Sequence, residues 1–151
     1  MYAVVRIRGT VNTTRGIKDT LEMLRLDKAN ACSLVLENPV YKGMLNAVKD
    51  WVTYGEVDRN SLVEMLKKRL RLNGNKRVDE TILKQIGIDS YEALADGLMA
   101  GKTRLKDFDR LQPFFRLTPP SKGFKSVKES FPKGDLGYRG KEINELLMRM
   151  I

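Results

Sequence analysis

Strand-like and helix-like segments alternate along the first 57 residues, and this alternation limits the possible folds more than any other feature of the sequence. A strand is predicted at Tyr2–Arg8, where alternate residues divide between two faces. A helix is predicted in the next segment, because Ile17, Leu21 and Leu24 recur at helical spacing. A strand in residues 31–37, a second helix and a strand in residues 51–57 follow. This order predicts an α+β fold in which helices pack on a sheet.

The second helix has the most specific start signal in the chain. Asn38 is a favourable capping residue, and Pro39 suits the first turn, where a missing N–H costs nothing. Met44, Leu45 and Val48 then provide an apolar face.

After Val57 the pattern changes to a mostly helical extension with one basic loop. Ser61 and Glu64 fit a capping box, which predicts a helix that begins there and ends by Gly74. The other predicted elements are helices at Glu80–Ile86, Ser90–Ala100 and residues 141–151, and a strand at Phe114–Leu117. We therefore divide the chain into a core of residues 1–57 and an extension of residues 58–151.

The charge balance favours a polyanionic partner. The 28 Lys and Arg residues face 19 Asp and Glu residues, which gives a net charge of +9 and a pI near 9.7. No apolar run reaches the length of a membrane span, and the start of the chain lacks the pattern of a signal peptide. Cys32 is the only cysteine, which fits a reducing cytoplasm. We expect no membrane contact and no cofactor.

The basic residues gather in three windows that contain no acid: residues 1–18, 65–78 and 110–128. A single such window is usually a solvated face, but three together favour contact with phosphates. Their members are Arg6, Arg8, Arg15 and Lys18; Lys67, Lys68, Arg69, Arg71, Lys76 and Arg77; and Arg110, Arg116, Lys122, Lys125 and Lys128.

The third window contains the sharpest local signal, the loop "TPPSKGFKS". Gly123 permits close approach of a ligand to the backbone, and Lys122 and Lys125 flank Phe124, which could stack on a base. The alternative is that Phe124 packs into the core of the protein itself.

The first window places Arg6 and Arg8 on one strand face. If that face is uncovered at its end, both guanidinium groups point at one partner and suit phosphate oxygens. The loop "GTVNTTRG" then adds small polar residues and the free N–H groups of a helix start. The alternative is a polar helix cap beside ordinary surface arginines.

No catalytic motif is complete. "GLMAGKT" lacks the first glycine of a phosphate-binding loop, because the required position is Asp96. The chain has no histidine, and Asp107 and Asp109 have no glycine-rich loop or histidine near them. An enzyme acting on a small anionic substrate is therefore disfavoured, and for Cys32 and Ser33 we expect a packing role.

Two stretches, "RIRGTVNTTRGIKDTLEMLRL" and "LENPVYKGMLNAVKDWVTYGEV", resemble the universal large-subunit ribosomal protein family L-thirty, whose eukaryotic counterpart is L-seven. The most specific part is Asn38-Pro39 followed by Gly43-Met44-Leu45 and Val48. The extension resembles the long form of archaea and eukaryotes, and without the basic N-terminal arm of the eukaryotic form the chain looks archaeal.

The resemblance implies a ferredoxin-like β-α-β-α-β core, no catalysis, and a structural role in the large subunit near the central protuberance. The implied partners are 23S-type rRNA, 5S rRNA and neighbouring ribosomal proteins, bound as a monomer within the cytoplasmic ribosome. The alternative function is a regulatory RNA- or DNA-binding protein outside the ribosome. From the resemblance and the basic windows together, the predicted RNA-binding residues are Arg6, Arg8, Thr10, Asn12, Thr13, Thr14, Arg15, Gly16, Lys42, Gly43, Arg116, Lys122, Gly123, Phe124 and Lys125.

Overall fold

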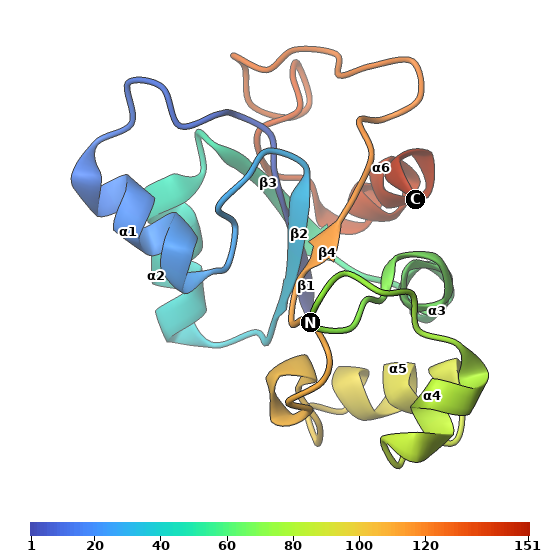
Figure 1. The fold of residues 1–151 in the computed structure, drawn as a ribbon. Helices are drawn as coiled ribbons and strands as arrows, with labels where there is room; N and C mark the ends of the chain where they lie inside the picture. The colour runs from blue at the N-terminus through green and yellow to red at the C-terminus, as the bar shows by residue number, and fades with distance from the viewer.

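A five-stranded mixed sheet forms the centre of the computed structural model, which describes residues 1–151 (Figure 1). The strand order is β4-β2-β1-β3-β5, and only β3 and β5 are parallel neighbours. The strands are β1 Tyr2–Arg6, β2 Ala31–Val35, β3 Val52–Glu56, β4 Phe115–Arg116 and β5 Gly137–Tyr138. The predicted α+β fold is confirmed, with β1, β2 and β3 as the strands of the predicted core.

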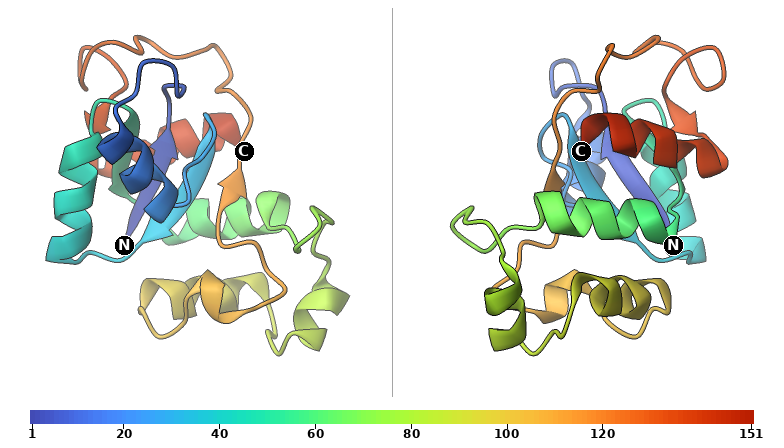
Figure 2. Two further views of the ribbon diagram at one scale, coloured as in Figure 1. Left: turned by 60° about the vertical axis from the view of Figure 1, so that its left-hand side comes forward. Right: turned by 90° about the vertical axis from the view of Figure 1, so that its right-hand side faces the viewer.

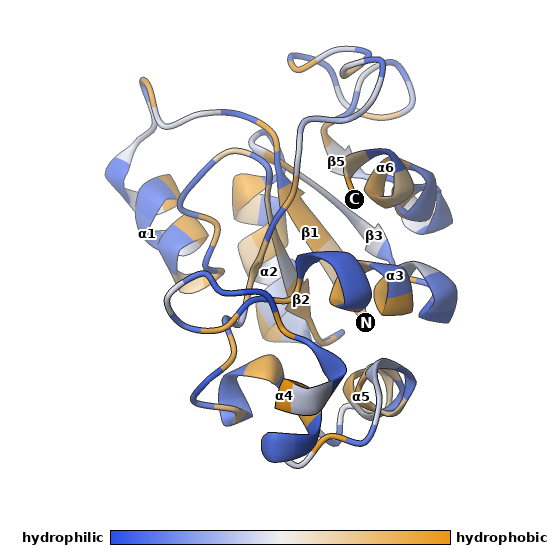
Figure 3. Cartoon of the chain, turned by 45° about the vertical axis from the view of Figure 1, so that its right-hand side comes forward, coloured by the Kyte–Doolittle hydropathy of each residue, from blue (hydrophilic) through white to orange (hydrophobic).

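The central strand β1 is buried on both faces, and all five of its residues are buried. Ala3 and Val5 belong to one hydrophobic cluster and Tyr2 and Val4 to the other, as the predicted alternation requires. Figure 3 shows the hydrophobic colour of β1 in the middle of the molecule. The strand is shorter than predicted.

Helices α1 (Arg15–Met23) and α2 (Pro39–Val48) cover the first face of the sheet. Asn38 caps α2 as predicted, because its side chain accepts a hydrogen bond of 3.2 Å from the Val40 N–H. The cap and Pro39 at the first turn begin the helix immediately after β2.

The second face is covered by α3 (Arg59–Arg69) and α6 (Ile143–Met150), which pack with Ala3 and Val5 in a cluster of 24 buried residues. The right-hand view of Figure 2 shows α4 (Glu80–Gln85) and α5 (Tyr91–Met99) below α3. Short 3-10 helices lie at Leu105–Asp107 and Gly140–Glu142. The extension thus supplies the second layer and both edge strands, while the division of the chain at residue 57 stays a prediction.

Helix α3 differs from its prediction at both ends. It begins at Arg59, two residues before the expected capping box, because the Asn144 side chain accepts the Asp58 N–H at 2.8 Å. It ends at Arg69, and Gly74 instead serves a tight turn with a φ of +92°. The predicted α4, α5, α6 and β4 are confirmed within a few residues.

Candidate nucleic-acid interface

Four segments far apart in the sequence meet at one end of the sheet, which we call the loop end. This is where β1 finishes and β2 and β3 begin, since Arg6 pairs with Val52 and Val5 with Cys32. The register of β4 and β5 sends the chain between them, residues 117–136, to the same end. Figures 1 and 2 show this segment and the loop before α1 together at the top of the molecule.

Exposed cations predominate at the loop end. The exposed acids there are fewer, namely Asp19, which pairs with Arg15 at 4.0 Å, and Asp27, Asp50 and Glu129. The exposed cations are Arg8, Arg15, Lys28, Arg116, Lys122, Lys125, Lys128 and Lys133. A surface of this kind attracts phosphates and gains affinity by releasing their counterions.

Arg8 is held in position while it stays exposed. Its Nη1 donates to the Asp50 carbonyl at 3.2 Å, and its guanidinium lies 5.5 Å from the centre of the Trp51 ring. This contact with the indole restricts the side chain, and the remaining N–H donors are free for a phosphate.

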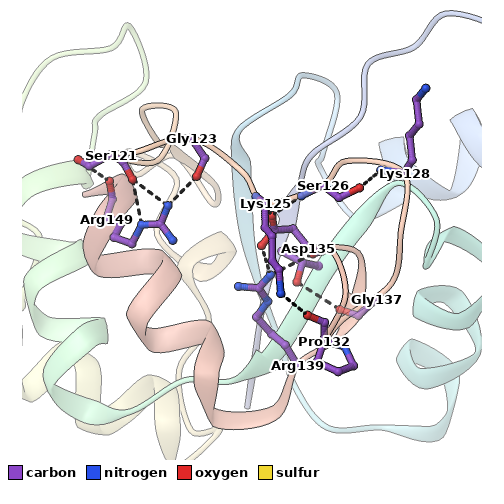
Figure 4. Close-up of polar contacts among 11 residues, drawn as sticks. Ser121, Gly123, Lys125, Ser126, Lys128, Pro132, Asp135, Gly137, Arg139 and Arg149 are labelled. Atoms are coloured by element: carbon purple, nitrogen blue, oxygen red, sulfur yellow. Dashed lines mark hydrogen bonds and ion pairs between the residues drawn. The ribbon is translucent and has the colours of Figure 1, made fainter.

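A buried ion pair organises the loop of residues 117–136 (Figure 4). The Asp135 carboxylate pairs with the Arg139 guanidinium and also accepts the backbone N–H groups of Lys125 and Ser126. The Arg139 guanidinium lies 5.2 Å from the centre of the Phe131 ring. These contacts hold the backbone around Lys125 in one conformation.

Arg149 of α6 fixes a second part of the same loop (Figure 4). It donates to the Ser121 carbonyl at 3.0 and 2.8 Å and to the Gly123 carbonyl at 2.6 Å. Lys122 stands between these two carbonyls in the left-handed region, with a φ of +68°, and its side chain is exposed. The protein thus presents Lys122 from a turn whose shape it has already set.

Two of the predicted contact residues are buried. The Arg6 side chain is 1% exposed and donates to the carbonyls of Leu26, Asp27 and Arg8 at 2.6, 2.8 and 2.9 Å. The prediction that Arg6 and Arg8 point together at one partner is therefore wrong, because the turn after α1 covers Arg6. Thr13 is also buried, with 8% exposure.

Phe124 is half-buried and packs against the larger hydrophobic cluster. This favours the alternative in which the ring packs into the core of the protein itself, and stacking of its exposed part on a base stays a prediction. Thr10, Asn12, Thr14, Arg15 and Gly16 are exposed in the loop before α1 and in its first turn, and Arg116 and Gly123 are exposed too.

Lys42 and Gly43 lie away from the loop end. Lys42 Nζ pairs with Glu37 Oε1 at 2.7 Å, and Glu37 also accepts the Tyr2 hydroxyl at 2.9 Å, which places the group at the start of β1. The hydrogen bond from Lys42, followed by that from Tyr2, lowers the pKa of the Glu37 carboxyl. Gly43 is open to solvent, and a Cβ there would meet no atom within 4 Å.

Comparison with known proteins supports the ribosomal resemblance. A family model described as "Ribosomal protein L30p/L7e" matches residues 2–52. The chain is 48% identical over 151 residues to the large ribosomal subunit protein uL30 of Archaeoglobus fulgidus, and the match covers 99% of both chains. The chain belongs to the L30p/L7e family. It is also 47% identical to the uL30 protein of Methanocorpusculum labreanum, over 99% of both chains, and 42% identical to that of Nanoarchaeum equitans, over 100% of this chain and 99% of the other.

In this L30p/L7e chain the family-model match ends with Val52, at the first residue of β3. The matches to the archaeal uL30 proteins continue through the extension, which carries the ion pair and the arginine that shape the basic loop. Sequence reasoning missed Asp135, Arg139 and Arg149. The spacing of Asp135 and Arg139 was a weak signal for a pair, but nothing in the sequence pointed to Arg149.

The second basic window of the L30p/L7e chain forms a separate cleft of about 570 Å³ between the end of α3 and the turn after it. Several of its cations already have partners inside the protein. Lys67 pairs with Glu92 at 3.1 Å, and Arg69 donates to the Ile151 carbonyl at 2.7 Å.

Neither metal nor thiolate chemistry finds support in the side chains of this family member. No group of three or more His, Cys, Asp or Glu residues could hold a metal ion. Burial raises the pKa of the Cys32 thiol to about 12, so the thiolate is not formed near neutral pH. No helix has the length and apolar character needed to cross a bilayer.

Proposed function

We propose that this L30p/L7e chain is a structural constituent of the large ribosomal subunit and binds rRNA through the loop end. One observation carries the proposal. Exposed cations at the loop end project from backbone segments whose conformation is fixed by contacts with buried or half-buried arginines of the same chain. Such a surface binds RNA without first having to order its loops, so little conformational entropy is lost on binding.

Arg8, Arg15, Lys122 and Lys125 are the residues we assign to phosphate contact. Folded RNA presents its phosphates in an arrangement set by helix geometry, and fixed cations recognise that arrangement as a shape. Thr10, Asn12 and Thr14 add exposed hydroxyl and amide groups for the sugar and phosphate oxygens. No step of this role requires catalysis.

The finer assignment rests on the family resemblance. We infer that the partners are 23S-type and 5S rRNA and neighbouring large-subunit proteins, that the location is near the central protuberance, and that the chain is a monomer within the cytoplasmic ribosome. The competing regulatory role outside the ribosome predicts that the chain separates from large subunits at high salt. Persistent co-sedimentation at high salt would support the ribosomal role.

The test is a salt series of binding to large-subunit rRNA and to an unrelated structured RNA of equal length. Each lost phosphate contact reduces the magnitude of the negative slope of log affinity against log salt by about 0.7–0.9. The double variant Lys122→Ala with Lys125→Ala should therefore reduce that magnitude by about 1.4–1.8. The matched control replaces Lys84 of α4 and Lys102 just after α5, which are exposed; these two helices lie at the bottom of Figure 1, away from the loop end. Equal slopes for both double variants would overturn the assignment, as would equal affinity for both RNAs.

A further inference from the structure

The outer edge of β2 is only half covered. β4 pairs with Ala31 and Cys32, and the Leu117 N–H donates to the Asn30 carbonyl at 3.0 Å. Alternate residues of an antiparallel strand direct both backbone groups to the same side. The groups of Cys32 and Leu34 therefore point outward, and Leu36 follows β2, whose last residue is Val35.

Proline ends the pairing at this edge. Continuing the β4 register places Leu34 opposite Pro113, which has no N–H to donate. No backbone hydrogen bond joins Leu34 to Pro113, and Leu36 makes no backbone hydrogen bond at all. The backbone groups of Leu34 and Leu36 thus have no backbone partner on this side, at the end of β2 away from the loop end.

A groove follows this open edge, and its apolar walls come from both faces of the sheet. Met23 and Tyr41 line it on one side and Leu98 and Leu105 on the other, around a cavity of about 110 Å³. This volume compares with the roughly 150 Å³ engineered cavity that holds a benzene ring, so it admits about one side chain. Met23 is 65% exposed, which is unusual for so large an apolar side chain.

The charge around the groove has one sign. Arg25, Arg104 and Lys106 line it, and no acidic residue does. A partner that combines acidic groups with apolar side chains therefore complements it.

We propose that this edge binds an extended peptide segment, with apolar residues at its centre and acidic residues beside them, as an additional strand next to β2. A peptide strand supplies the alternating donors and acceptors that Leu34 and Leu36 require, and its side chains alternate between the two apolar walls. RNA phosphates accept hydrogen bonds but donate none, so they satisfy only half of this edge. The proposal goes beyond the rRNA-binding role and concerns a separate surface.

The test uses the purified full chain and labelled synthetic octapeptides. The probe is Glu-Glu-Val-Thr-Leu-Val-Glu-Glu, and its matched control has Lys in place of each Glu. Because main-chain hydrogen bonds provide most of the recognition, an unoptimised sequence is sufficient. We expect saturable binding of the acidic peptide, at least ten-fold weaker binding of the basic one, and slower amide hydrogen exchange at Leu34 and Leu36. N-methylation of alternate peptide bonds on the edge-facing side should weaken binding at least ten-fold.

Paired variants separate this surface from the loop end. Arg104→Glu with Lys106→Glu should weaken binding of the acidic peptide and leave the rRNA salt slope unchanged. Lys122→Glu with Lys125→Glu should reduce the rRNA salt slope and leave binding of the acidic peptide unchanged. Unchanged exchange at Leu34 and Leu36, equal binding of the N-methylated peptide, or protection of the same amides by an oligouridylate would overturn the proposal. A failure of rRNA binding alone would overturn only the proposed function.

Discussion

Replacing Arg6 by Met tests whether this guanidinium serves the fold or an external partner. Three backbone carbonyls, those of Leu26, Asp27 and Arg8, accept from it. Met fills similar space and donates nothing, so the carbonyls lose their partners. Burial also lowers the pKa of Arg6, which reflects the cost of holding its charge inside the protein.

The expected loss of stability depends on how well each carbonyl is shielded from water. The bond to Leu26 is buried, and an orphaned buried acceptor costs about 1–3 kcal/mol. The bonds to Asp27 and Arg8 are partly buried, so water replaces some of each loss. Arg6 Nη2 is buried without a partner, and its removal returns part of the cost. We expect a net loss of about 3 kcal/mol, which lowers the Tm by about 6–12 °C in a chain of this length.

The assay is urea unfolding followed by the fluorescence of Trp51, the only tryptophan. Arg8→Met is the matched control, since Arg8 is exposed and its loss should change stability by about 0.5 kcal/mol at most. We expect the rRNA salt slope to fall for Arg8→Met and to stay unchanged for Arg6→Met. A variant Arg6→Met that keeps full stability but binds rRNA more weakly would refute the reasoning.

Three other substitutions test single contacts. Gly43→Ala should stabilise the chain by about 1 kcal/mol in thermal unfolding, because its Cβ meets nothing within 4 Å and Ala favours helix; a lower Tm would contradict this. Lys42→Ala should raise the pKa of Glu37 in an NMR titration. Because the pKa of Glu37 is lower in the folded protein, the contacts of its carboxylate stabilise the fold at pH values above the unfolded pKa. That stabilisation is lost as the pH falls through the folded pKa. An unchanged pKa in the Lys42→Ala variant would exclude the ion pair. Asp135→Asn should lower the free energy of unfolding in urea by about 3 kcal/mol, because the buried Arg139 loses its counter-charge. Amide hydrogen exchange in the surrounding loop should become faster. Unchanged exchange would argue against a role of this ion pair in holding the loop.

The elements that sequence predicts well are those whose signals lie within a few residues. Asn38 and Pro39 begin α2, and Ser90 caps α5 by accepting the Ala93 N–H at 3.1 Å, because capping requires only neighbouring backbone. The start of α3 depends on Asn144, which is 86 residues away, so a local capping box at Ser61 predicted it wrongly. Side chains that arrive from distant segments leave no local pattern.

The same distinction applies to the candidate site. The charge windows point to loops at which exposed cations gather, but exposure within them depends on packing from other segments. Leu26 and Asp27 cover Arg6, and Phe124 packs partly against the larger hydrophobic cluster. No pattern around either residue could show this, since the covering groups come from other elements.

The basic residues around the loop end therefore serve two uses, and the division limits how strongly a polyanion responds to the net charge of +9. The guanidinium groups of Arg6, Arg139 and Arg149 donate to backbone carbonyls or to a buried carboxylate. Their planar shape lets one side chain form several of these hydrogen bonds at once. Arg8 and Lys122 instead present exposed charge from backbone that these contacts hold. Counterion release depends on the charges that reach phosphates, so the salt slope of RNA binding should follow the exposed loop-end cations. A slope that follows the whole net charge would mean that the basic windows act only as a polycation.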